Sequence, residues 1–164
     1  MPTGPIHFSA GPGPRISPKD AVAALIVLPG RRYLMQRRDD RADIIYPGHW
    51  SCFGGAVQPG EGPRNALARE LREELEFEIE AVREYATFDF DLGAVGRGRF
   101  YRKYFVVHLP RSRFATLVLH EGSGMRVFSG EDLLRARWVV PHDAFAVWLH
   151  CAGRRVRYPS VRRS

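Results

Sequence analysis

Apolar positions along this chain follow two spacings, one typical of strands and one typical of helices. Residues 21–28 (AVAALIVL) form a short, unbroken apolar run, which predicts a buried strand. Pro29 and Gly30 then turn the chain, so residues 31–37 are expected to return as the second arm of a hairpin. Further extended segments are predicted at residues 49–53, 77–90, 100–109, 116–120 and 138–140.

The longest helical pattern begins near Pro63 and continues through a series of good helix formers. At roughly 100° per residue, Leu67, Leu71 and Leu75 fall on one stripe that can face a core. We expect this helix to continue through Glu76, because glutamate is a good helix former and no other stop signal is present.

Two more helices are predicted towards the C-terminus. Ser129 is a suitable N-cap for a short helix over residues 130–134, and Pro141 opens a final helix that runs to Cys151. Strands before and after a charged helix, with a closing C-terminal helix, fit a mixed β-sheet packed between helices. The pattern by itself therefore predicts an α/β or α+β fold.

The composition is that of an ordinary globular chain. Its 164 residues suffice for one domain with a substantial core, and 45% are hydrophobic and 26% charged. Proline and glycine dominate residues 1–18, which predicts an irregular arm before a folded domain over residues 19–152. There is no apolar run of the ~20 residues that span a bilayer, no secretory signal pattern and no close cysteine pair. We therefore expect a cytoplasmic protein with reduced thiols and no membrane partner.

The chain is strongly basic, with a formal net charge of +7. Such a charge attracts phosphate groups, whether on a nucleotide or on a nucleic-acid backbone. Much of the excess lies in residues 153–164, which we predict to be a basic tail. A solvated tail explains this run more simply than a binding surface does, and no sequence motif supports nucleic-acid binding.

The first predicted helix carries a cluster of acidic residues. Glu70, Glu73 and Glu74 sit at i, i+3 and i+4, so their carboxylates gather on one face and repel each other. Mg²⁺ takes oxygen ligands of this kind and completes its shell with water and phosphate oxygens. A solvated acidic face is the alternative, and the three glutamates alone do not decide between the two.

Residues around the cluster favour the metal interpretation. Glu61 precedes the helix and Arg69 lies inside it, so a structural ion pair between them would fasten the loop to the helix. The glycine pair Gly54 and Gly55 would let the backbone approach a metal closely and offer a carbonyl ligand.

Taken together, these residues resemble the Nudix box, G-x5-E-x7-R-E-U-x-E-E-x-G-U, in which U is bulky and apolar. The matching positions are Gly55, Glu61, Arg69, Glu70, Leu71, Glu73, Glu74 and Phe77. One position departs, because Glu76 stands where the box has a glycine that helps to end the helix.

The resemblance implies an α/β/α sandwich and a hydrolase that cleaves the diphosphate of a nucleoside diphosphate linked to another group, X. Water would attack one phosphorus, and a nucleoside phosphate would leave. Mg²⁺, or Mn²⁺ in its place, would be held by Glu70, Glu73 and Glu74, with the Gly54 carbonyl as a further ligand.

The resemblance also implies a general base and contacts to phosphate. A nearby glutamate would take the proton of the attacking water, and the candidates are Glu73 and Glu121, the latter in a Gly-rich loop after residues 116–120. An ordinary surface glutamate is the alternative for Glu121. Arg37 and Arg38, at the end of the predicted hairpin, are candidates for binding phosphate.

Two other functions stay open at the level of sequence. One is a nucleotide-binding module of the same fold that does not cleave its ligand, and the other is a basic nucleic-acid-binding protein. The nucleobase, the identity of X and the number of metal ions are not readable from the residues, and a homodimer is possible.

Overall fold

The computed structural model describes residues 19–91 and 99–153, so the predicted arm (1–18) and most of the predicted tail lie outside the described residues. The strands are β1 (Ala21–Leu28), β2 (Arg32–Arg37), β3 (Trp50–Ser51), β4 (Val82–Asp91), β5 (Arg99–His108) and β6 (Gly124–Ser129). The helices are α1 (Pro63–Leu75), α2 (Arg111–Phe114), α3 (Gly130–Arg135) and α4 (Pro141–Ala152). Of the helices described, none has the length and apolar character needed to cross a bilayer.

The strands form one mixed sheet in the order β3-β2-β1-β5-β4, and β6 pairs with β2. The predicted hairpin is confirmed, because β1 and β2 pair antiparallel with Leu28 opposite Arg32. Only β1 and β5 run parallel among the pairs of named strands within residues 19–91 and 99–153. The connection between these two strands passes through α1 and β4, which places α1 on one face of the sheet.

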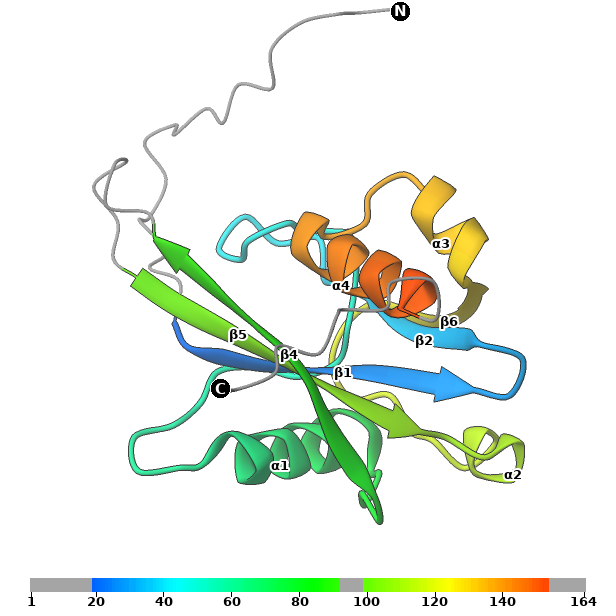
Figure 1. Cartoon of the computed structure of the whole chain (residues 1–164), viewed down its shortest axis with the longest axis horizontal. Helices are drawn as coiled ribbons and strands as arrows, with labels where there is room; N and C mark the ends of the chain where they lie inside the picture. The colour runs from blue at the N-terminus through cyan, green and yellow to red at the C-terminus, as the bar shows by residue number, and fades with distance from the viewer. Residues whose placement is uncertain (1–18, 92–98, 154–164) are drawn as a thin grey trace, which may run out of the picture.

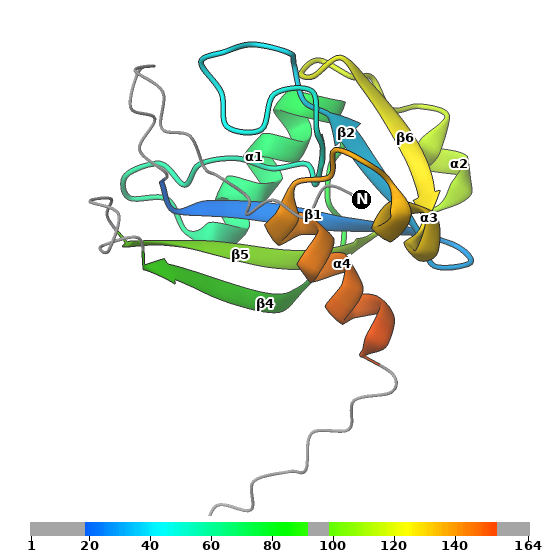
Figure 2. The same ribbon diagram turned by 90° about the horizontal axis from the view of Figure 1, so that it is seen from above.

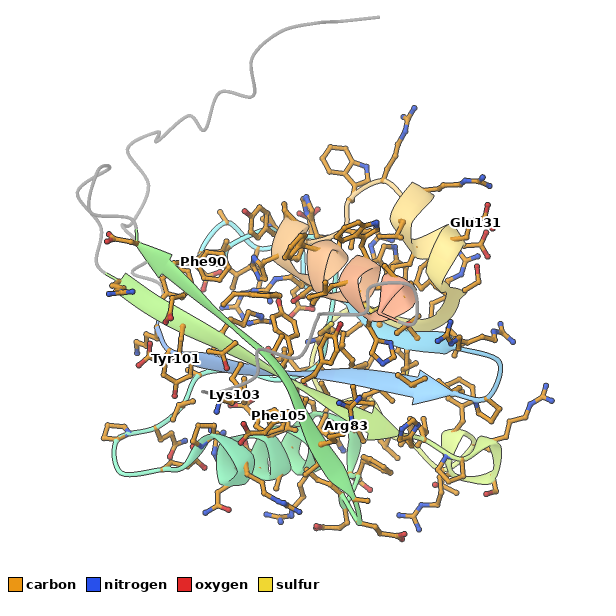
Figure 3. All side chains as sticks on the ribbon, viewed as in Figure 1. Arg83, Phe90, Tyr101, Lys103, Phe105 and Glu131 are labelled. Atoms are coloured by element: carbon orange, nitrogen blue, oxygen red, sulfur yellow. The ribbon has the colours of Figure 1, made fainter. Side chains whose placement is uncertain are left out.

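Helices cover both faces of this sheet (Figures 1 and 2). Alternate residues of β1 serve the two cores: Val22, Ala24 and Ile26 pack on the α1 side, while the residues between them pack on the side of α3 and α4. A strand buried on both faces needs apolar residues at every position, which explains the unbroken run. Phe105 of β5 belongs to the α1 core (Figure 3). The predicted mixed sheet between helices is confirmed.

The strand predicted at residues 116–120 is wrong, because this segment hydrogen-bonds to a helix end. The Val118 N–H donates to the Leu75 carbonyl and the His120 N–H to the Glu74 carbonyl, at 3.3 and 2.9 Å. Its apolar alternation is real, since Leu117 and Leu119 pack on the α1 core. The strand instead is β6, in the stretch where the sequence predicts a Gly-rich loop, and it pairs with β2 along six residues.

The expected continuation of the first helix through Glu76 is also wrong. The helix ends at Leu75, and Glu76 adopts the left-handed conformation with φ 52° and ψ 34°. The Glu76 N–H donates to the Arg72 carbonyl at 3.0 Å, and the Phe77 N–H donates to the Leu71 carbonyl at 3.1 Å. These bonds satisfy carbonyls at the helix end in the geometry for which glycine is usually chosen. The helix propensity of Glu76 therefore does not decide its conformation, because the hydrogen bonds at the end of α1 require a left-handed residue at this position.

Candidate active site

The glycine pair lies where β1 and β2 separate. β3 pairs with the end of β2, and the chain then crosses to β1, where Phe53 bridges to Ala24. The carbonyls of Phe53 and Gly55 accept hydrogen bonds from β1 at 2.8 and 2.9 Å. The intervening Gly54 carbonyl stands outside this pairing, so the predicted ligand atom is not used by the two bonds to β1.

Close contacts explain both glycines. Gly54 has φ +123°, and a Cβ there would lie 2.4 Å from the Val22 carbonyl oxygen. A Cβ on Gly55 would lie 2.6 Å from the carboxylate of Glu70. On the same side, the Gly54 N–H donates to Glu74 Oε2 at 2.9 Å. The glycine pair thus lies directly against the acidic face of α1.

The three helix glutamates have different surroundings. Glu74 is 3% exposed, and its burial raises the pKa of its carboxyl to about 8, even though the hydrogen bond from Gly54 lowers it. Burial also raises the pKa of Glu70, against the lowering effect of Arg69. Glu73 is on the solvent side, with a side chain that is 59% exposed. The site therefore contains one deeply buried acid and one accessible one.

Arg69 joins the loop to the acidic face. Its guanidinium donates to both carboxylate oxygens of Glu61, at 3.1 and 3.0 Å, and to the Ala56 carbonyl at 3.0 Å. Its Nη1 also donates to Glu70 at 2.8 Å and to Glu73 at 3.1 Å. The pair predicted between Glu61 and Arg69 is present in the structure, and the guanidinium additionally gathers two of the candidate metal ligands.

Replacing Arg69 by alanine should disturb both the loop and the orientation of these carboxylates. We expect Arg69→Ala to lower the melting temperature by about 3–5 °C and turnover by about tenfold. Arg72→Ala is the matched control, since Arg72 lies on the same helix and pairs at the exposed surface with Glu78, at 2.6 Å. Thermal melts and rates that do not differ between the two variants would contradict this role.

Glu121 lies close enough to the α1 glutamates for its charge to raise the pKa of both Glu70 and Glu74. It is exposed and lines a small cavity together with Gln36, Arg38 and Gly122. The structure thus brings Glu121 to the acidic site, although the prediction that it acts as a base stays a prediction.

The two candidate phosphate ligands differ in position. The Arg37 Nε donates to the Gly48 carbonyl at 3.3 Å at the exposed surface. The Arg38 Nε donates to the Ile45 carbonyl at 2.9 Å, and Arg38 lines the cavity that contains Glu121. Burial and the charge of Arg102 lower the pKa of Arg38. Only Arg38 is therefore brought into the surroundings of the acidic residues.

A buried network behind the glycine segment was missed by sequence reasoning. Asp143 is 0% exposed and accepts hydrogen bonds from the Tyr104 hydroxyl at 2.7 Å, the Cys52 N–H at 2.9 Å and Arg102 at 3.3 Å. In the sequence, Asp143 resembles any acid in the first turn of a helix. Two of its partners lie in β5 and the third is Cys52, all far from Asp143 in the sequence, so no local pattern could have revealed the network.

His142 precedes Asp143 at the start of α4, among aromatic rings. Its ring lies 6.0 Å from those of Tyr46 and Phe90, measured between centroids. Phe90 lies near the end of β4 (Figure 3). Burial lowers the pKa of His142 to about 4, against the raising effect of the neighbouring Asp143, and the charges of Arg102 and Arg38 act in the same direction as burial.

A histidine that stays neutral in the folded state makes the protein less stable to unfolding at acid pH. The unfolded chain binds the proton near pH 6.5 and the folded chain only near pH 4, so stability is present above 6.5 and lost as the pH falls. His142→Gln should therefore gain on the parent by on the order of 2 kcal/mol between pH 7 and pH 4. His108→Gln, at an exposed position, is the control. Denaturant melts that show the same pH dependence for all three proteins would contradict the prediction.

The carboxylate oxygens of the acidic residues are suitable ligands for a hard divalent ion. Within residues 19–91 and 99–153, no three His, Cys, Asp or Glu side chains form a preassembled metal group. The donors are nevertheless all oxygens, and Glu70 and Glu73 already converge on one cationic nitrogen of Arg69. The space that a Cβ on Gly55 would fill belongs to Glu70. This donor set is suited to Mg²⁺ or Mn²⁺.

The fold and the site together define an α/β/α sandwich with a glycine pair packed on an acidic helix. A model of the NUDIX domain matches residues 17–159, and the chain belongs to the Nudix family. Nucleoside triphosphatase NudI from Escherichia fergusonii is 46% identical over 54 residues, which are 33% of this chain and 37% of that protein. The chain thus matches little more than a third of the length of the curated relatives.

Solved structures agree with this fold over most of the chain. The E. coli ORF135 protein aligns with a TM-score of 0.68 and 29% identity, covering 92% of this chain and 99% of that one. The MutT protein from Methanosarcina mazei Go1 aligns with a TM-score of 0.69 and 20% identity, covering 88% and 100% of the two chains.

Proposed function

We propose that the protein is a metal-dependent hydrolase that cleaves the diphosphate of a nucleoside diphosphate linked to another group. The observation that carries the proposal is the packing of the glycine pair on α1. The Gly54 N–H reaches Glu74 and Gly55 leaves room for Glu70, so the glycine segment and two acidic side chains share one surface. Membership of the Nudix family supports the same reaction.

In this proposal Glu70, Glu73 and Glu74 hold the divalent ions, and the Gly54 carbonyl is a further ligand. Such ions, when bound, neutralise charge on the diphosphate oxygens and lower the pKa of a water molecule. Arg69 orients Glu70 and Glu73 through its Nη1 contacts. Glu74, which is 3% exposed, contributes its carboxylate from the buried side of the site.

The proposal assigns the remaining steps to Glu73, Glu121 and Arg38. Glu121 or Glu73 accepts the proton of the attacking water, because both are accessible and neither is as deeply buried as Glu74. The guanidinium of Arg38, beside Glu121, provides positive charge for a phosphate oxygen. As water adds to one phosphorus, the bond from that phosphorus to the bridging oxygen breaks, and a nucleoside phosphate leaves.

The relatives suggest where to begin the search for a substrate. NudI is a nucleoside triphosphatase, and a nucleoside triphosphate is a nucleoside diphosphate whose group X is a phosphate. We propose nucleoside triphosphates as the first class to test, followed by nucleotide sugars and dinucleotides.

A panel of these nucleotides with Mg²⁺ tests the function. We expect release of a nucleoside monophosphate from at least one compound, and loss of that release in Glu70→Gln. Glu131→Gln is the matched control, because Glu131 lies on α3 and pairs at the surface with Arg135. Binding of a nucleotide without product release would instead indicate a non-cleaving binding module.

A further inference from the structure

The segment that carries Glu121 is attached at both ends. On one side, the His120 N–H donates to the Glu74 carbonyl at the end of α1, at 2.9 Å. On the other, the Ser123 N–H donates to the Arg37 carbonyl of β2 at 2.8 Å. Gly122 lies so near that a Cβ there would be 2.6 Å from the same Arg37 oxygen. Glu121 thus lies between α1 and β2, and backbone hydrogen bonds attach the chain to these two elements on either side of it.

A side-chain pair reinforces the attachment to α1. His120 Nε2 lies 2.6 Å from Glu76 Oε1. Glu76 is the left-handed residue that ends α1, at the position where the Nudix box has glycine. A glycine would adopt this conformation without strain but could not reach His120. This chain therefore carries a strained residue and gains a contact to the residue beside Glu121.

We propose that Glu76 and His120 are positioning residues that hold Glu121 beside the α1 glutamates. The proposal rests on the hydrolase function proposed above. Both side chains are about half exposed, at 59% and 48%, and polar contacts between side chains at such exposed positions contribute little to stability. A gain in folding stability therefore does not explain the contact between Glu76 and His120. The geometry of that contact does restrain His120, and with it the adjacent carboxylate of Glu121.

Kinetics of paired variants test the proposal. Glu76→Gly and His120→Ala should each lower kcat about tenfold with KM nearly unchanged, because a displaced catalytic group affects the reaction step. In a Glu121→Gln background neither change should lower kcat further, since nothing is left to position. His120→Gln, whose amide can still donate to Glu76, should restore most of the rate. Glu78→Gln, which alters a surface pair near the same helix end, is the control.

Amide hydrogen exchange gives a readout that needs no turnover. The peptide over residues 118–123 should exchange faster in His120→Ala and in Glu76→Gly than in the parent, while the exchange of α4 stays the same. Unchanged exchange there, or rate losses that add to that of Glu121→Gln, would overturn the positioning role. If Glu121→Gln keeps full activity while Glu74→Gln has none, the positioning role also fails and the hydrolase function stands. If the parent hydrolyses no nucleotide, the proposed function fails, and the exchange result still decides whether the pair holds this segment.

Discussion

Glu74→Gln should abolish hydrolysis and at the same time make the metal-free protein more stable at alkaline pH. Glu74 is buried against Gly54, which raises its pKa to about 8. Glutamine keeps an acceptor for the Gly54 N–H but removes a charge that a metal ligand needs. The loss of several kcal/mol of transition-state stabilisation corresponds to a fall in turnover of about a thousandfold.

The sign of the stability effect follows from the raised pKa of Glu74. Its carboxyl titrates near 4.5 in the unfolded chain and near 8 in the fold, so its contribution is present below pH 4.5 and lost as the pH rises through 8. Above that pH the parent must bury a charge and the variant does not. Denaturant melts in a chelator at pH 9 should favour Glu74→Gln by on the order of 3 kcal/mol. A variant that is less stable than the parent under these conditions would show that burial does not raise the pKa of Glu74.

Alanine substitutions at the two adjacent glycines should have different effects: Gly55→Ala should mainly lower turnover, and Gly54→Ala should mainly lower stability. In Gly55→Ala the new Cβ meets the Glu70 carboxylate, the movable end of a side chain, at 2.6 Å. We expect the fold to lose less than about 1 kcal/mol, while displacement of Glu70 costs about a hundredfold in turnover. In Gly54→Ala the Cβ meets the Val22 backbone at 2.4 Å in a positive-φ conformation, which should cost about 3 kcal/mol of stability or more.

Gly62→Ala is the control for both changes. Gly62 has ordinary extended angles, and nothing lies within 4 Å of a Cβ placed there. Its turnover should stay close to that of the parent, and its melting midpoint should fall only slightly, because Gly62 is the N-cap of α1 and alanine is a poorer N-cap than glycine. Equal stability losses at Gly54 and Gly55, or full activity in Gly55→Ala, would contradict the close approach of the glycine pair to Glu70.

Sequence reasoning succeeded where neighbours in the chain are also neighbours in space. The run at residues 21–28 predicts β1 because residues 22–28 face one or the other of two cores in alternation. The helical spacing of Leu67, Leu71 and Leu75 likewise predicts the buried face of α1. The same local logic placed Ser129 as an N-cap, whose hydroxyl accepts the Asp132 N–H at 3.0 Å.

The failures arose where a tertiary partner decided the structure. Residues 116–120 have the alternation of a strand, but their backbone bonds go to the end of α1. Glu76 favours helix by propensity, yet it is left-handed where the chain leaves α1, and its side chain contacts His120. The network of Asp143 joins α4 to β5 and to Cys52, and no spacing in the sequence connects these residues.

The dependence of turnover on Mg²⁺ concentration tests the central claim most directly. With any nucleotide that the panel identifies, the parent should show no turnover in a chelator and a rate that rises and saturates with added Mg²⁺. Glu74→Gln should stay inactive at every concentration, while Glu131→Gln should follow the parent. Equal hydrolysis with and without the metal ion, or a Glu74→Gln curve that matches the parent, would contradict a metal-dependent hydrolase built on the α1 glutamates.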